Sequence, residues 1–147
     1  MSFENFKPCL FCEIVQGKQP SWPVLEDENS LAFLDKRPLF PGHCLLIPKR
    51  HVAALGDLPG ELLGPLFENA QRLARAMEAG LGADGSFVAI NNRVSQSVPH
   101  LHVHIVPRRK KDGLKGFFWP RNPYRDEAEM LDVQSRLREA LEPQNRG

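Results

Sequence analysis

The chain has 147 residues, of which 41% are hydrophobic and 25% charged, and its formal net charge is +1. This length suits one globular domain with its own core and leaves no room for a second full domain. The near-neutral balance gives no overall field that would recruit nucleic acid or an acidic membrane. Basic residues do gather between Arg108 and Arg125, around the stretch RRKK, which would form a solvated loop or a polyanion site.

Five short runs of apolar and β-branched residues predict strands, with turn residues between them. They cover residues 24–26, 30–35, 43–48, 87–91 and 100–106. Strands of this length suit a small, mainly antiparallel sheet.

Two amphipathic stretches predict helices. In residues 59–80 the apolar side chains recur every three or four positions, and Gly80 is placed to end the helix. Residues 126–141 repeat the pattern, with Asp126 as the N-cap and Pro143 beyond the last turn. Strands and helices in this segregated order indicate an α+β fold with about five strands, one main helix and a C-terminal helix.

The sequence contains no clear membrane or export segment. No run approaches the roughly 20 apolar residues that cross a bilayer, and residues 1–8 lack a basic start followed by a long apolar run. We therefore expect a cytoplasmic protein that binds no membrane and no specific nucleic acid.

Three of the five histidines, His100, His102 and His104, alternate with aliphatic residues in the sequence PHLHVHIV. In a strand, alternate side chains share one face, so the three imidazoles would form a row with steps of about 7 Å. A solvated strand face or an adventitious metal patch would also give this pattern, but three imidazoles on one face favour a functional site. Such a row can bind a metal as three ligands, or divide its members between nucleophile and supports.

A polar turn, NNRVSQS, stands just before these histidines at residues 91–97. Its backbone amides, the Gln96 amide and the Ser97 hydroxyl are neutral groups that can bind an anion. A neutral imidazole that attacks phosphorus needs such donors for the phosphate oxygens, and a hydroxyl to assist the leaving group. The combination favours phosphoryl or nucleotidyl transfer.

The stretch QSVPHLHVHIV resembles the motif of the histidine triad (HIT) family, in which three histidines alternate with apolar residues. The stretch from CLFCEIVQG to LLIPKRHV is similar to the N-terminal half of that domain. The resemblance implies a HIT-like fold over residues 8–110, with 111–147 as a C-terminal extension, and a homodimer.

The resemblance also implies an enzyme, a HIT-type nucleoside phosphoramidase or dinucleoside polyphosphate hydrolase. A histidine would attack the α-phosphate of a purine nucleotide, and water or another acceptor would then resolve the covalent nucleotidyl-histidine. Two alternatives stay open: a nucleotide-binding regulatory module with little turnover, and a nucleotidyltransferase or phosphorylase that uses a different acceptor.

The family pattern implies a role for each matching residue. His102 is the nucleophile, His104 contacts the phosphate oxygens, and His100 is the first member of the triad. Ser97 would hydrogen-bond the leaving group or the α-phosphate. The other implied nucleotide contacts are Gln96 and Val98 in the phosphate loop, Asn91 or alternatively Asn92 as a further amide, Asp35 on the ribose hydroxyls, and Phe11, Ile14 and Phe33 around the base, where ordinary core packing is the alternative. Ser95 departs from the family pattern, because many members have a glycine there that tolerates positive φ.

Cys9 and Cys12 have the C-x₂-C spacing of a zinc knuckle, but a tetrahedral site needs two more ligands. In zinc-bearing HIT proteins these are the histidine after an apolar strand and the first triad histidine, which are His51 and His100 here. The resemblance therefore implies a structural zinc ion, and two reduced, partly buried thiols are the alternative. Cys44, in an apolar run, is expected to be a buried hydrophobic residue.

His43 and Trp119 each have two possible roles. His43, in the sequence FPGH, would hydrogen-bond locally or support the triad. Trp119, in GFFWP, would anchor the C-terminal segment or reach the active site of the partner in the implied dimer.

Overall fold

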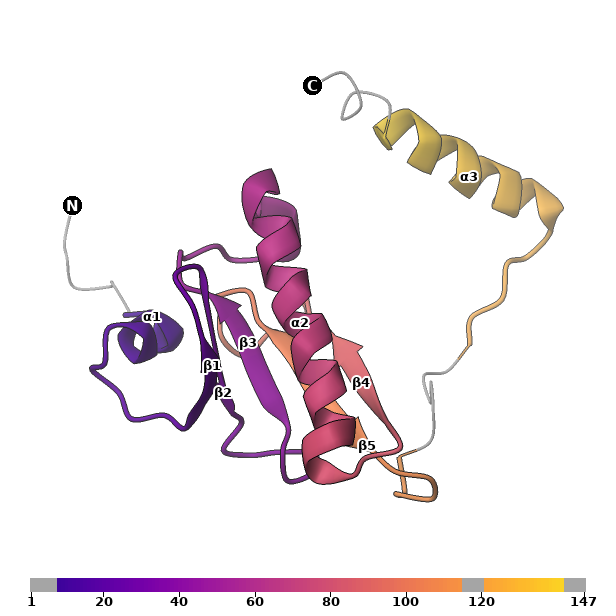
Figure 1. Cartoon of the computed structure of the whole chain (residues 1–147). Coiled ribbons are helices and arrows are strands. Elements are labelled where there is room, and N and C mark those ends of the chain that lie inside the picture. Colours follow the sequence, from indigo (N-terminus) through magenta and orange to yellow (C-terminus); the bar gives the residue numbers. More distant parts are fainter. Residues whose placement is uncertain (1–7, 115–120, 142–147) are drawn as a thin grey trace, which may run out of the picture. The chain divides into compact units, whose positions relative to one another are not determined.

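The computed structural model describes residues 8–114 and 121–141. The chain forms two compact units, Met1–Asp112 and Gly113–Gly147, and each is described by itself (Figure 1). Among the described residues, no helix is long and apolar enough to cross a membrane. The division into a HIT-like domain over 8–110 and an extension over 111–147 stays a prediction. Trp119 and Pro143 lie outside the described residues.

The first unit is built on a five-stranded sheet in the order β1-β2-β3-β5-β4. All neighbouring strands pair antiparallel. The strands are β1 Pro23–Glu26, β2 Ser30–Leu34, β3 Cys44–Pro48, β4 Gly85–Ala89 and β5 Val103–Arg108. The predicted α+β fold with about five antiparallel strands is confirmed.

Alternation along the central strands gives the sheet two apolar faces. On β2, Ala32 packs into a core cluster with residues of helix α2 (Gly60–Leu81), which lies across β3, β4 and β5 (Figure 1). Its neighbour Phe33 turns to the opposite face, where it packs with Phe11 of the short helix α1 (Leu10–Val15). The sheet is therefore covered on one face by a long helix and on part of the other by a single short one.

Helix α2 follows the predicted apolar stripe. Leu66, Ala70, Leu73 and Met77 are all buried. The predicted end at Gly80 is wrong: the helix continues to Leu81, and Gly82, at φ 66°, takes the left-handed conformation that ends it. The second unit contains helix α3, which spans Glu127–Leu141. Asp126 accepts a hydrogen bond from the Glu129 N–H at 2.9 Å, which agrees with its expected role as N-cap.

The last strand begins three residues later than predicted, at Val103 instead of His100. In the β3–β5 register, Leu46 lies opposite Val103, and continuing it would bring Leu101 opposite Pro48. Proline has no N–H to donate to a ladder, and the Leu101 N–H bonds instead to the Val52 carbonyl at 2.8 Å. His100 and His102 are thus held by a loop beside the sheet.

Strand β4 is also displaced, to Gly85–Ala89 from the predicted 87–91. Gly85 pairs with Arg108 and Ser86 with Pro107. Glycine and serine in this position resemble a turn in sequence, and only the pairing with β5 makes them part of the sheet. Helix α1 had no prediction at all, because six residues are too few to show a periodic pattern.

Candidate active site

The three triad histidines do not form the evenly spaced row that the strand prediction implied. The rings of His102 and His104 lie 5.0 Å apart between centroids, while the Nδ1 of His100 faces Cys9 at 3.4 Å. The early departure of the chain from β5 lets His100 turn toward the cysteines. His100 and His102 are buried, and His104 is half-buried.

His102 has one ring nitrogen bonded and the other available. Its Nδ1 lies 2.8 Å from the backbone carbonyl oxygen of His100, and since a carbonyl only accepts, Nδ1 carries the proton. In the neutral ring this leaves the lone pair on Nε2. Phe11 packs its ring edge-on to His102 at 5.1 Å between centroids, which fixes the plane of the imidazole.

A chain of hydrogen bonds determines the tautomer of His104. The Leu39 N–H donates to Nδ1 of His43 at 3.1 Å, so the proton of neutral His43 is on Nε2. That Nε2 lies 3.0 Å from Nδ1 of His104, which must then accept. His104 therefore presents its own Nε2–H as a neutral donor, the tautomer that suits a phosphate oxygen.

The same environment keeps both imidazoles neutral. The pKa of His104 is lowered to about 4, chiefly by burial and in addition by the neighbouring His102 and His43, against the opposing effect of Asp35. Burial also lowers the pKa of His43, against the opposing effect of Asp35, whose Oδ2 is 3.7 Å from Nε2. At neutral pH the network therefore carries its protons as hydrogen-bond donors rather than as cationic charge.

A cleft of about 340 Å³ opens onto these groups. Eight of the predicted site residues line it: Phe11, Ile14, Phe33, Asp35, Ser97, Val98, His102 and His104. Its lining includes both imidazole and apolar side chains, so it can hold a polar group against His102 and an apolar group against the aromatic rings.

Gln96 and Asn91 do not line this cleft. The side chain of Gln96 accepts from the Arg93 N–H at 2.8 Å and donates to the Ala53 carbonyl at 2.6 Å. Asn92 accepts from the Leu55 N–H at 2.8 Å. These amides brace the loop that carries Ser97, and Asn91 is exposed.

The braced loop contains two non-glycine residues in the left-handed region, Arg93 at φ 70° and Ser95 at φ 58°. Such backbone is unfavourable for residues with a Cβ. Ser95 was expected to replace a glycine that tolerates positive φ. The loop does give Ser95 a positive φ.

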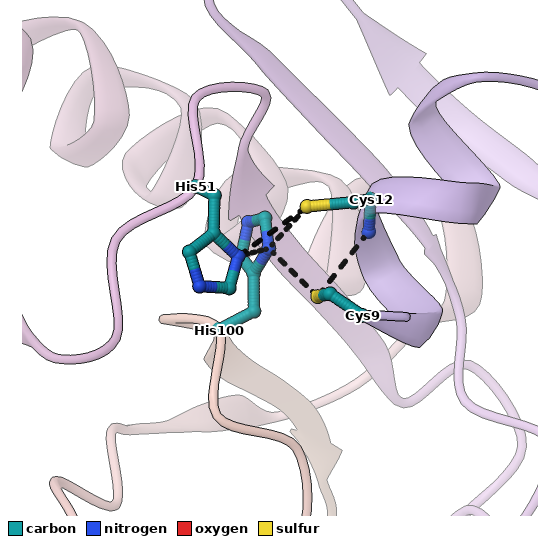
Figure 2. A group of neighbouring side chains, drawn as sticks. All are labelled: Cys9, Cys12, His51 and His100. Atoms are coloured by element: carbon teal, nitrogen blue, oxygen red, sulfur yellow. Dashed lines mark hydrogen bonds between the residues drawn. The ribbon is translucent and has the colours of Figure 1, made fainter. Parts of the chain in front are cut away.

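The four predicted metal ligands come together in one cluster (Figure 2). Cys12 Sγ lies 3.3 Å from Nδ1 of His51 and 3.6 Å from Nδ1 of His100. The two Nδ1 atoms are 3.2 Å apart. A tetrahedral zinc ion with ordinary bond lengths needs ligand atoms about 3.3–3.8 Å apart, so the cluster fits this ion.

The donor chemistry of the cluster also suits zinc. Nε2 of His100 donates to the Pro48 carbonyl at 2.8 Å, which leaves the Nδ1 lone pair toward the cysteines. In the protein alone, burial and the neighbouring Cys9 raise the pKa of the Cys12 thiol to about 11. A bound cation would offset this by stabilising the thiolate.

The metal cluster and the cleft share helix α1. Cys9 is its N-cap, with the Cys12 N–H pointing at Cys9 Sγ at 3.4 Å. Phe11, between them, packs against Phe33 with ring centroids 5.4 Å apart and lines the cleft. Anchoring the two cysteines therefore also anchors one wall of the cleft.

Sequence reasoning missed several residues that line the cleft. They are Leu10, Gln19, Pro20, Ser21, Leu34, Lys36, Arg37 and Leu45. Lys36 and Arg37 directly follow Asp35, and that adjacency was the one signal in the sequence that could have found them. The segment around Gln19 has no pattern that separates it from an ordinary loop.

Comparison with known proteins agrees with this arrangement. A family model described as the HIT domain matches residues 16–111. An uncharacterised HIT-like protein of Mycobacterium tuberculosis is 41% identical over 143 residues, which are 94% of this chain and 96% of that protein. An adenosine 5′-monophosphoramidase of Saccharomyces cerevisiae is 42% identical over 109 residues, covering 72% of this chain and 66% of that protein.

A solved structure of a zinc-bound protein agrees with the fold. The crystal structure of a zinc-bound histidine triad family protein from Mycobacterium smegmatis matches with a TM-score of 0.69 and 42% identity, covering 90% of this chain and 96% of that one. The family model spans more than half of the chain, and the resemblance predicted from the triad and its lead-in is confirmed. The chain belongs to the HIT family.

Proposed function

We propose that the protein is a nucleotide hydrolase or transferase that attacks the α-phosphate of purine nucleotide phosphoramidates or dinucleoside polyphosphates. The observation that carries this proposal is the hydrogen bond from Nδ1 of His102 to the His100 carbonyl, which leaves a basic Nε2 on a residue that lines the cleft. The yeast relative named adenosine 5′-monophosphoramidase supports the choice of substrate class.

In the proposed reaction, Nε2 of His102 attacks the α-phosphorus in line with the leaving group. For a phosphoramidate, the P–N bond breaks as the departing nitrogen takes a proton that the Ser97 hydroxyl relays from solvent, so that ammonia or an amine leaves. The Nε2–H of His104 donates to a non-bridging oxygen, where negative charge increases in the transition state. Water then attacks the phosphorus of the nucleotidyl-histidine, which releases the nucleoside monophosphate and restores neutral His102.

The rest of the cleft would hold the nucleoside. Asp35 would accept hydrogen bonds from the ribose hydroxyls, and the apolar side chains of Phe11, Ile14 and Phe33 would enclose the base. Val98 would pack beside the sugar and phosphate. Gln96 and Asn91 would act through the shape of the loop, since neither lines the cleft.

Zinc on Cys9, Cys12, His51 and His100 belongs to the same proposal, as a structural ion. A tetrahedral site with four protein ligands leaves no open position for a substrate. When bound, the ion would supply a fixed link between α1 and the loop before β5. The catalytic groups are then His102, His104 and Ser97.

We also propose that the protein is a cytoplasmic homodimer. Strand β4 is at an edge of the sheet, where its outer backbone groups are available to another strand. Val88 on this strand is 44% exposed, and Leu63 and Phe67 on α2 are 41% and 40% exposed. A second copy packed along this edge and helix would bury these apolar side chains.

The test uses wild-type protein and the His102→Ala variant, each incubated with adenosine 5′-phosphoramidate and diadenosine tetraphosphate. Wild-type protein should release AMP from at least one of them, and rapid-quench mass spectrometry should detect an adenylyl adduct on His102. The variant should form no adduct and lose turnover. Turnover that persists in His102→Ala would refute the assignment.

The same experiment separates the alternative functions. Tight nucleotide binding by the wild type, with neither adduct nor product, would identify a binding module. Products that change when inorganic phosphate or a sugar phosphate is added would identify a transferase or phosphorylase that uses the same covalent step.

A further inference from the structure

Two cationic side chains, Lys36 and Arg37, line the cleft immediately after Asp35. Oδ1 of Asp35 accepts a hydrogen bond from the Arg37 N–H at 2.9 Å, so the carboxylate closes the turn that carries both cations. Nζ of Lys36 lies over the Trp22 ring, 5.4 Å from its centroid. The backbone of this turn is therefore held in place, and two cationic residues follow the carboxylate directly in the chain.

The local charge balance is positive. Within residues 8–114 and 121–141, neither Lys36 nor Arg37 makes an ion pair with a carboxylate, whereas Lys49 and Arg108 each do. In this turn the two formal positive charges therefore outnumber the single negative charge of Asp35. The hydroxyls of an unmodified ribose carry no negative charge for these two cations to bind, so an anionic group is the better match.

We infer that the cleft takes nucleotides that carry a second phosphate on the 2′ or 3′ oxygen of the ribose, with Lys36 and Arg37 as its partners. This inference rests on the proposed function, in which Asp35 binds the ribose. In dinucleotide-binding sites, a carboxylate accepts from the ribose hydroxyls, whereas an arginine accommodates a ribose phosphate. Here one hydroxyl would donate to Asp35, and the phosphate on the other would meet the two cations.

The structure of Asp35 makes this combination possible. Its Oδ1 is engaged by the Arg37 N–H, and its Oδ2 remains 3.7 Å from Nε2 of His43. Oδ1 thus keeps one acceptor site and Oδ2 keeps both, so the carboxylate can accept from the hydroxyl that carries no phosphate. Guanidinium and ammonium groups are the side chains that bind phosphate best, the former with two parallel hydrogen bonds.

A phosphate in the leaving group is the competing occupant of the two cations. It would be attached to the α-phosphorus beside His102 instead of to the ribose. The two cases are distinguished by ligands that carry the same number of phosphates in different places.

The experiment measures dissociation constants by titration calorimetry of the full chain with AMP, adenosine 2′,5′-bisphosphate, adenosine 3′,5′-bisphosphate and ADP. One of the two bisphosphates should bind about tenfold or more tightly than both AMP and ADP. In the double variant Lys36→Gln/Arg37→Gln, the ratio of its affinity to that of AMP should fall to near one.

The matched control is the double variant Arg75→Gln/Lys110→Gln, which removes the same two charges from exposed positions outside the cleft lining. It should keep the wild-type preference. Equal affinity for AMP and both bisphosphates, or tighter binding of ADP alone, would overturn the inference while leaving the proposed function intact. Failure of AMP itself to bind would count against the nucleotide cleft, and so against the proposed function as well.

Discussion

His100 and His102 are joined by a hydrogen bond between the ring of one and the backbone of the other. Nδ1 of His102 donates to the His100 carbonyl at 2.8 Å, while Nδ1 of the His100 ring faces Cys9 at 3.4 Å. The residue proposed to bind zinc thus also sets the tautomer of the proposed nucleophile. A shift of His100 at the metal cluster would therefore alter the hydrogen bond that orients the ring of His102.

Metal removal should therefore weaken nucleotide binding and turnover together. Without the proposed zinc ion, α1 would lose its link to His51 and His100, and Phe11 would move away from the cleft with it. We expect chelated protein and the Cys12→Ser variant to lose near-equimolar zinc, to bind AMP about tenfold or more weakly, and to unfold at a lower temperature. Elemental analysis, calorimetry and thermal scans measure these three effects.

The control for this prediction is Cys44→Ala. Cys44 is a buried thiol outside the cluster, bonded to the Gly42 carbonyl at 3.2 Å. This variant should keep its zinc and its affinity for AMP. Metal-free protein that binds AMP as tightly as the wild type would show that α1 needs no metal to form the cleft.

His43 should act as a positioning residue for His104. In His43→Phe, no donor holds Nδ1 of His104 as an acceptor, so the ring can present either nitrogen to the phosphate. We expect kcat to fall about tenfold or more with a smaller change in KM, since the loss concerns donation in the transition state.

His43→Gln keeps an N–H at this position and should recover much of the lost kcat. Thermal unfolding of both variants serves as the check on the fold. Equal activity of His43→Phe and His43→Gln would contradict a role in selecting the tautomer.

Acid should destabilise the fold through His104 in a defined pH range. The folded-state pKa is about 4, lowered from 6.5 chiefly by burial. Between these values the unfolded chain binds more protons than the folded one, so the free energy of unfolding falls as the pH drops from 6.5 to 4. The loss should be about 2 kcal/mol, less than the whole pKa difference would give because the ring is half-buried.

Urea denaturation at several pH values measures this effect. His104→Gln should lose most of the pH dependence, and the remainder would come from buried histidines such as His43, whose pKa is shifted in the same direction. If the free energy of unfolding of His104→Gln depended on pH as strongly as that of the wild type, groups other than His104 would cause the acid sensitivity.

The sequence predicted the parts of the site that depend on local pattern. The alternating histidines and the C-x₂-C spacing pointed to the triad and to Cys9 and Cys12, and the resemblance to the HIT family supplied His51 and the other predicted residues of the cleft and the metal cluster. The positions of His100 and His102 relative to β5 could not be predicted, because they depend on Pro48 in a strand more than 50 residues earlier in the chain. Lys36 and Arg37 were missed for a related reason: only the folded turn shows that charged loop residues line a cleft.

Ser95→Gly should stabilise the protein. Ser95 is at φ 58°, where a residue with a Cβ is less favourable than glycine, and its side chain is exposed. The gain in the free energy of unfolding should be about 1 kcal/mol, as relief of backbone strain exceeds the greater entropy of glycine in the unfolded chain. Ser86→Gly, in the exposed part of β4, is the control and should destabilise by roughly 0.5–1 kcal/mol. If both variants lose stability alike in urea, the left-handed conformation of Ser95 carries no cost in the native loop.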